Sequence, residues 1–236
     1  SKALKDAITK GTIISNPIDR MIEVPKVTLK EINPLTSDEV KMLLSINNRW
    51  TPLFTVLVGT GLRKGEALGL TWDNVDLDSD NPTLKVTRTL QVTTKGTLLG
   101  YPKTDSSRRE IPLSHSVVRA LRAHRTTQNE QKLRLGNVWN DLNLVFPNTV
   151  GKFMAKCIPN TNLDRSCKEV GIDKHVRVHD LRHTCGSLMH QNGVTAKEIQ
   201  KILGHANIQI TLDLYIHTDT KTLRDATDIL DQAING

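Results

Sequence analysis

Strand-like patterning occurs in one window of this chain, residues 72–112, and helical patterning lies on both sides of it. Within the window, "TLKVTRTLQV" and "SRREIPL" read as strands, and "DSDNP", "TKG" and "KTDSS" are turn-forming stretches. We therefore predict a small antiparallel sheet of about three strands. The fold class that follows is mostly α with this one small sheet, an α+β fold.

The helical segments carry start and stop signals that place them. Thr36 and Glu39 match the capping-box pattern ahead of an apolar face. "WTPLFTVLVGTGL" predicts a buried helix that ends at Gly59 or Gly61, and "RKGEALGLTW" predicts a short helix directly after it. Further helices are predicted at 114–135, with a basic outer face, and in "LDRSCKEVGI", "HDLRHTCGSLMHQNG", "TAKEIQKILGH", "NIQITLDLYIH" and residues 220–234.

The two ends of the chain look separate from the main domain. "ALKDAITKGTII" has a helical apolar pattern, "SNP" stops it, and "IEVPK" continues as an extended linker. We interpret residues 1–29 as the remnant of a preceding domain plus its linker, and residues 30–218 as the main domain. Residues 219–236 then form a tail helix with an apolar stripe.

Composition narrows the class of partner. The formal net charge of +7 favours a polyanion, and because aromatic residues make up only 3% of the chain, we expect contacts to phosphates rather than stacking on bases. Three cysteines without CxxC spacing argue against a disulfide framework and indicate a cytoplasmic protein. No apolar run approaches the ~20 residues of a membrane span, so no membrane partner is expected.

The stretch "HDLRHTCGSLMHQNG", residues 179–193, poses the main question about chemistry. On a helix, Leu181, Cys185 and Leu188 share one arc, whereas His179, Arg182, His183 and Gly186 lie opposite. Three interpretations remain open from these residues alone. The polar face can be solvated, His179 and His183 with Cys185 can bind a metal, or Arg182 and His179 can hold an oxyanion.

Two distant segments favour the oxyanion. Arg63 follows a glycine-ended helix at the start of the next helix, where backbone N–H groups and a guanidinium together suit an anion, and Glu66 can brace it. The alternative for Arg63 is a surface salt bridge with Glu66. His205 follows a Leu-Gly helix stop, and Tyr215 comes ten residues later. The alternative for Tyr215 is a half-buried core tyrosine.

Together, "TGLRKGEALGL", "HDLRHT", "LGH" and the tyrosine of "ITLDLYIH" resemble the tyrosine recombinases, the integrases of phages and conjugative transposons. The resemblance covers about residues 30–230, the family's catalytic domain, and makes 1–29 the end of its core-binding domain. It implies that Arg63 and Arg182 hold the scissile phosphate, that His179 and His205 assist, and that Tyr215 is the nucleophile. It also implies a catalytic lysine, for which "GYPKTDSSRREIPL" supplies Lys103 and "TTKGT" the rival Lys95.

The resemblance implies a site-specific recombinase that cuts and rejoins DNA through a 3′-phosphotyrosine link, with neither a metal nor ATP nor another cofactor. Its use would be the integration or excision of a mobile element. The implied partners are double-stranded DNA at a specific site, further copies of the chain in a tetramer on DNA, and accessory DNA-bending or directionality factors, in the cytoplasm of a bacterial host. The alternatives are a type IB topoisomerase-like enzyme that relaxes DNA, a DNA-binding module without catalysis, and a metal-dependent nuclease.

Two further expectations concern residues around the site. The side chains expected to contact DNA phosphates are Lys64, Lys95, Arg108, Arg109 and Arg177, while Glu66 supports Arg63 from behind. The tail, residues 219–236, is expected to pack on a neighbouring protomer, with packing on its own domain as the alternative. The role of His183, the target DNA sequence, the host element and the direction of recombination do not follow from the sequence.

Overall fold

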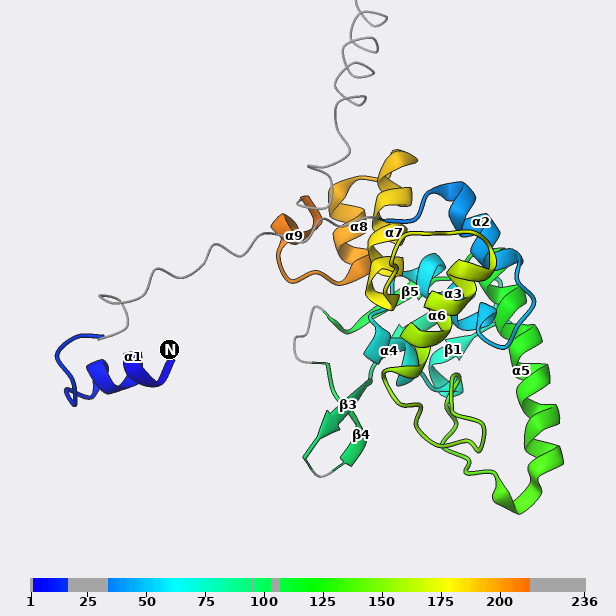
Figure 1. Cartoon of the computed structure of the whole chain (residues 1–236), viewed down its shortest axis with the longest axis horizontal. Coiled ribbons are helices and arrows are strands. Elements are labelled where there is room, and N and C mark those ends of the chain that lie inside the picture. Colours follow the sequence, from blue (N-terminus) through cyan, green and yellow to red (C-terminus); the bar gives the residue numbers. More distant parts are fainter. Residues whose placement is uncertain (1, 17–33, 95, 103–106, 213–236) are drawn as a thin grey trace, which may run out of the picture. The chain divides into compact units, whose positions relative to one another are not determined.

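The computed structural model describes residues 2–16, 34–94, 96–102 and 107–212 (Figure 1). The chain divides into two units, Ser1–Glu31 and Ile32–Gly236. The first unit contains α1 (Lys2–Thr9), the helix predicted for "ALKDAITKGTII", and α1 has no buried residues. The tail helix predicted at 220–234 lies outside the described residues.

Helix α3 (Thr51–Thr60) is the centre of the second unit. It contacts α2 (Ser37–Ser45), α4 (Lys64–Leu68), α5 (His115–Leu135) and α7 (Val178–Gln191). Apolar residues all round the helix explain this position, since a helix buried on every side needs no polar face. It ends at Gly61 in the left-handed conformation, φ 62°, one of the two predicted ends. A Cβ on Gly61 would clash with the Leu203 side chain, so the glycine also permits close packing there.

The strands form two small antiparallel sheets. One has the order β1 (Val75–Asp76), β2 (Thr83–Val86), β5 (Arg109–Pro112), and the other is the hairpin β3 (Thr89–Thr93) with β4 (Gly96–Gly100). The mostly helical α+β class is confirmed, but the prediction of a single sheet was wrong. Strand β3 packs on α4, and a Cβ on Gly69, directly after α4, would lie 2.8 Å from the Leu90 nitrogen.

Three more α-helices belong to the described part of the second unit. They are α6 (Ile158–Glu169), α8 (Ala196–Leu203) and α9 (Ile208–Leu212), and α8 contacts both α7 and α9 (Figure 1). The predicted capping box of Thr36 and Glu39 starts α2, and a second one, of Thr195 and Glu198, starts α8. Within the described residues, no helix has both the length and the apolar character that crossing a bilayer requires.

Candidate functional site

Arg182 is the most deeply buried of the charged residues that the structure describes. Although it lies on the polar side of α7, only 2% of the residue is exposed. Its Nη1 donates to the carbonyl of Gly61 at 2.6 Å and its Nη2 to the carbonyl of Leu203 at 2.6 Å. The interpretation of a solvated polar face is therefore wrong for Arg182. Burial, together with the charge of Arg63, lowers the pKa of Arg182 to about 9, which still leaves it protonated at neutral pH.

Arg63 and Glu66 form a linked pair at the start of α4. Arg63 Nη1 donates to Glu66 Oε1 at 2.8 Å, and the backbone N–H of Arg63 donates to Glu66 Oε2 at 2.9 Å. The Arg63 side chain is 36% exposed, whereas Glu66 is 4% exposed, so the pair is not the surface salt bridge considered as an alternative. Arg63 Nη2 donates to the carbonyl of Gly204 at 2.8 Å.

Arg63, Arg109 and Arg182 form an arginine cluster around Glu66. The position of Arg109 corrects the expectation that it contacts a DNA phosphate. Its side chain is 6% exposed, and its Nη2 donates to Glu66 Oε2 at 3.0 Å. Its Nε donates to the carbonyl of Ile202 at 2.6 Å. A side chain enclosed in this way does not fit the expected role as a DNA phosphate contact. Alternation along β5 carried the signal that was missed, because Arg109 lies on the strand face of the buried Ile111.

The other phosphate-contact candidates differ in exposure. Arg108 is exposed, and its guanidinium lies 5.5 Å from the centre of the Tyr101 ring. Lys64 is partly exposed. Arg177 is 47% exposed and donates from Nε and Nη2 to Asp180, at 3.0 and 2.9 Å. Lys95 lies outside the described residues.

Two histidines from different helices flank the arginines. His205, directly after the left-handed Gly204, is 8% exposed, and its Nδ1 lies 2.8 Å from Thr211 Oγ1. Burial, and then the charge of Arg182, lowers the pKa of His205 to about 3. His179 is exposed on α7, and its pKa is lowered by partial desolvation and by the charge of Arg182. Both imidazoles are therefore neutral at pH 7.

His183 packs against His179 rather than pairing with it around a metal. The two rings are 4.7 Å apart and nearly perpendicular, at 87°. The third proposed ligand, Cys185, is 3% exposed and belongs to a small core with Ile199 and Leu203, and burial raises the pKa of its thiol to about 12. Among the described residues, no group of three His, Cys, Asp or Glu side chains is arranged to hold a metal ion. His179, His183 and Cys185 are thus not arranged as the ligands of one metal ion.

The electrostatic character of the cluster follows from these contacts. The guanidiniums of Arg63 and Arg109 pair with one buried carboxylate, that of Glu66, and the charge of Glu66 also acts on the nearby Arg182. The guanidiniums lower the pKa of Glu66 against the opposing effect of its burial, so it stays ionised. The positive charge therefore exceeds the negative charge in a region with little access to water. Such an arrangement can bind an anion that carries more than one negative oxygen.

Comparison with known proteins assigns the chain to a family. Residues 33–222 match the sequence model of the Phage integrase family. The chain belongs to that family. It is 32% identical over 95% of its length to a tyrosine recombinase XerC-like protein of Caldanaerobacter subterraneus subsp. tengcongensis, and spans 61% of that protein. It is 25% identical to the ICEBs1 integrase of Bacillus subtilis, over 99% of this chain and 63% of the relative. The chain thus spans about six-tenths of the length of these relatives.

The fold of this integrase-family chain is also that of solved integrases. It is similar to the Tn1549 transposon integrase, solved in complex with transposon right end DNA, with a TM-score of 0.76 and 25% identity. That match covers 97% of this chain and 76% of the solved one. The XerA recombinase is similar with a TM-score of 0.62 and 25% identity, over 90% and 67% of the two chains.

The structure of the integrase domain brings four of its six candidate catalytic residues into one region. Arg63 and Arg182 contact successive residues at the end of α8, His205 follows that end, and His179 lies one helical turn before Arg182. Lys103 and Tyr215 lie outside the described residues, and their roles stay predictions.

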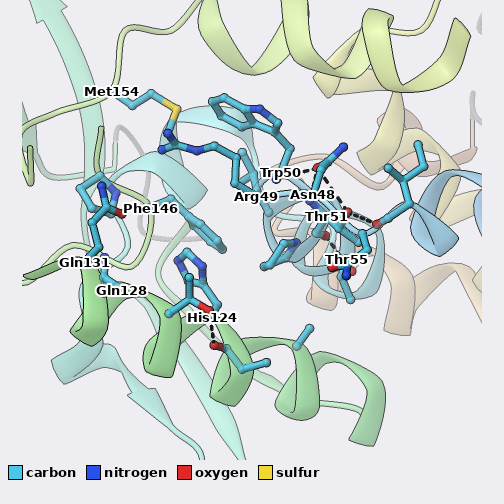
Figure 2. A pocket seen from close by; sticks show the side chains of 18 of the residues that line it. Asn48, Arg49, Trp50, Thr51, Thr55, His124, Gln128, Gln131, Phe146 and Met154 are labelled. Atoms are coloured by element: carbon cyan, nitrogen blue, oxygen red, sulfur yellow. Dashed lines mark hydrogen bonds between the residues drawn. The ribbon is translucent and has the colours of Figure 1, made fainter. Parts of the chain in front are cut away.

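A separate cavity of about 570 Å³ lies between the α2–α3 connection, α5 and the loop that precedes α6. Figure 2 shows Asn48, Thr51, His124 and Gln128 around it. Three of its polar side chains are bonded to the protein backbone, whereas the buried Nε1 of Trp139, which also lines it, has no hydrogen-bond partner among the described residues. Asn48 Oδ1 accepts from the Trp50 N–H at 2.8 Å, His124 Nε2 donates to the carbonyl of Val145 at 2.6 Å, and Gln128 Nε2 donates to that of Leu144 at 3.0 Å. None of the described catalytic candidates lines this cavity.

Proposed function

We propose that this chain is the catalytic domain of a site-specific DNA recombinase that integrates or excises a mobile element. The observation that carries the proposal is the buried arginine cluster, in which Arg63 and Arg182 are held by backbone carbonyls beside an excess of positive charge. Membership in the Phage integrase family supplies the reaction for which such a cluster is suited.

In the proposed reaction, the Tyr215 hydroxyl attacks a backbone phosphorus of DNA. A bond forms between the tyrosine oxygen and phosphorus, the bond from phosphorus to the 5′-oxygen breaks, and the 5′-oxygen leaves as a hydroxyl. The tyrosine proton passes to His179 or to solvent, and Lys103 supplies a proton to the leaving oxygen. A 5′-hydroxyl from the partner strand then reverses the step. Because the phosphotyrosine keeps the diester bond energy, no ATP is needed.

The arginines stabilise the charge that builds on the non-bridging oxygens in the transition state. A guanidinium has five N–H donors, and the described residues engage two nitrogens of Arg182, those bonded to Gly61 and Leu203. These bonds fix the plane of the guanidinium before DNA arrives, so little reorganisation is needed during reaction. Neutral His205, beside the cluster, can donate a hydrogen bond to a phosphoryl oxygen without adding charge.

The proposed partner is double-stranded DNA at a specific site. The formal net charge of +7 supports a polyanionic partner, and Lys64, Lys95, Arg108 and Arg177 are the proposed phosphate contacts. Relatives such as the Tn1549 integrase were solved in complex with DNA. We further propose a tetramer on DNA with accessory bending or directionality factors, in the cytoplasm of a bacterial host.

The ends of the chain carry a related proposal. Residues 1–29 belong to a preceding core-binding domain and its linker, and residues 219–236 pack on a neighbouring protomer, so that assembly and cleavage are coupled. Deletion of 219–236 should weaken assembly on DNA or alter the control of cleavage, measured by native gel shift and by adduct yield. Unchanged assembly and unchanged cleavage would reject exchange of the tail.

The deciding experiment traps the covalent intermediate. The chain is incubated with nicked DNA that carries its candidate site, so that the short strand diffuses away after cleavage and the adduct accumulates. We expect a protein–DNA adduct at Tyr215, mapped by mass spectrometry, in the presence of EDTA. Tyr215→Phe should bind the same DNA and form no adduct.

The outcomes separate the alternatives. An adduct in Tyr215→Phe would reject the nucleophile, and loss of activity in EDTA with rescue by zinc or magnesium would favour a metal nuclease. Relaxed circles without strand exchange would favour a topoisomerase-like enzyme. DNA binding without any adduct would favour a module that has lost catalysis.

A further inference from the structure

The C-terminus of α8 is held by three arginines that come from three different elements. The carbonyls of Ile202, Leu203 and Gly204 accept, in that order, from Arg109 Nε at 2.6 Å, Arg182 Nη2 at 2.6 Å and Arg63 Nη2 at 2.8 Å. The last carbonyls of a helix have no partner within the helix, and cations are favoured near them. Three consecutive carbonyls therefore receive three separate guanidiniums, carried by β5, α7 and the start of α4.

Arg109 differs from the other two arginines because it donates from all three of its guanidinium nitrogens, whereas the guanidinium bonds of Arg63 and Arg182 among the described residues come from Nη1 and Nη2. Its side chain is 6% exposed, against 36% for Arg63. Its Nη2 donates to Glu66 Oε2 at 3.0 Å, and the other oxygen of Glu66 accepts from Arg63 Nη1 at 2.8 Å. Its Nη1 donates to the carbonyl of Ser107 at 3.2 Å, which ties the guanidinium to its own strand.

We infer that Arg109 is a positioning residue, which sets Arg63 through Glu66 and sets His205 through the end of α8. The residue holds the carbonyl of Ile202, three positions before His205, and His205 is fixed at its other side by Thr211. One buried guanidinium thus links two groups proposed to act on the phosphate, although it does not itself face DNA. This inference rests on the function proposed above and extends it to a residue whose charge pattern had suggested a DNA contact.

Lysine cannot replace Arg109 in this role, although it can replace its charge. An ammonium is a single point of donation, whereas Nε and Nη2 lie on different positions of a rigid plane. Lysine at this site can neutralise Glu66 or reach the carbonyl of Ile202, but it does not hold both in register. Arg109→Lys therefore keeps the buried charge balance and removes the link.

The test compares Arg109→Lys with Arg134→Lys in the full 236-residue chain. Arg134 is exposed in the last turn of α5 and is not one of the proposed phosphate contacts, so it is a matched control for an arginine-to-lysine change. The affinity for the nicked site is measured by titration, and the rate constant of adduct formation is measured at saturating DNA. Melting temperature is recorded for each variant.

For Arg109→Lys we expect a rate constant at saturation lower by about 100-fold, because displacement of reacting groups by about 1 Å has an effect of this size. Its affinity for DNA should stay within about threefold of the wild type, since an enclosed side chain makes no phosphate contact. Arg134→Lys should form the adduct at the wild-type rate. A change confined to the rate constant is not the result of a general loss of folded protein.

A double variant adds a readout that a purely structural role would not give. If Arg109 acts through Arg63, then Arg109→Lys combined with Arg63→Lys should react little more slowly than Arg63→Lys alone, because both changes remove the same interaction. Fully additive effects of the two changes would overturn the inference. Arg109→Gln is a second variant, whose amide can still donate to the carbonyl of Ile202 without a charge.

Each remaining outcome decides between the positioning role of Arg109 and another role for it. A wild-type rate in Arg109→Lys would overturn this inference alone, and so would unfolding of both Arg109→Lys and Arg109→Gln, which would assign Arg109 to stability. Lower DNA affinity with an unchanged rate at saturation would return Arg109 to the phosphate contacts. No adduct from the wild type would overturn the proposed function and this inference with it.

Discussion

The arginine cluster and the cavity beside α5 contrast in how their polar groups are satisfied. In the cavity, Asn48, His124 and Gln128 are bonded to the backbone of the surrounding loops (Figure 2). In the cluster, Arg63 and Arg109 share the buried carboxylate of Glu66, and Arg182 is bonded to two backbone carbonyls, so positive charge is in excess among the described residues. The cavity has a volume of about 570 Å³, but the excess of positive charge lies in the arginine cluster.

Under the proposed function, the excess of buried positive charge marks the candidate site, whereas the volume of the cavity does not. Burial of a cation is costly unless hydrogen bonds and opposite charge stabilise it. The chain has placed Arg182 at 2% exposure with two carbonyl partners, where an apolar side chain would have packed without this cost. Such a position is explained if the cation serves an anionic ligand.

The largest expected effect comes from Arg182→Lys. The ammonium can reach one of the two carbonyls but cannot hold a planar fork toward a phosphate, so adduct formation should fall by about 10²- to 10³-fold. The measurement is the rate of adduct formation at saturating DNA. The matched change in the other region is Arg49→Lys, since Arg49 lines the cavity and its guanidinium lies 5.0 Å from the Trp50 ring centre. Equal loss of activity in the two variants would remove the distinction between the regions.

Sequence patterns predicted the local features of this fold well. The capping box at Thr36, the left-handed end at Gly61 and the helical phase that buries Leu181 and Cys185 all depend on neighbours within a few residues. The second sheet, formed by β3 and β4, was not predicted, and neither was the close packing of Gly69 against Leu90 of β3. That contact joins segments whose proximity exists only in the folded chain.

The site was predicted less completely, for the same reason. The pattern around Arg63 and Arg182 indicated an oxyanion site, but not that Arg182 is enclosed, because its partner Gly61 is 121 residues away in the sequence. Arg109 was taken for a phosphate contact because neighbouring arginines look alike in a charge pattern. Which of the two faces inward is decided by strand alternation and by the carbonyl of Ile202, 93 residues away.

An intermediate effect is expected on the pH dependence of stability. The folded-state pKa of His205 is about 3, below the ordinary value of 6.5, so the unfolded chain binds more protons at acid pH. The stability that neutral His205 contributes is complete above pH 6.5 and is lost as the pH falls toward 3. Between pH 7 and pH 5, the loss should be about 2 kcal/mol.

The measurement is urea unfolding of the wild type and of His205→Asn at both pH values. The variant keeps a polar side chain but has no titrating group, so its free energy of unfolding should fall less on acidification, by about 2 kcal/mol. An equal fall in both proteins would show that burial and the charges of Arg182 and Arg63 do not lower the pKa of His205.

The smallest effect on activity is expected in the cavity itself, from His124→Leu. His124 Nε2 donates to the carbonyl of Val145, and its ring stacks on Phe146 at 5.0 Å, so the change removes a donor from a buried acceptor while keeping apolar contact. The free energy of unfolding should fall by about 1–3 kcal/mol, a decrease of roughly 2–4 °C in melting temperature per kcal/mol. Adduct formation at 25 °C should stay at the wild-type rate.

A fall in the rate of adduct formation by His124→Leu, with intact DNA binding, would contradict this expectation in an informative way. Helix α3 contacts both α5, which carries His124, and α7, which carries Arg182. A strain introduced at the cavity would then have travelled through α3 to Gly61, whose carbonyl holds Arg182. In that case the cavity and the arginine cluster would be two parts of one coupled structure, because a change in the packing of one would alter the geometry of the other.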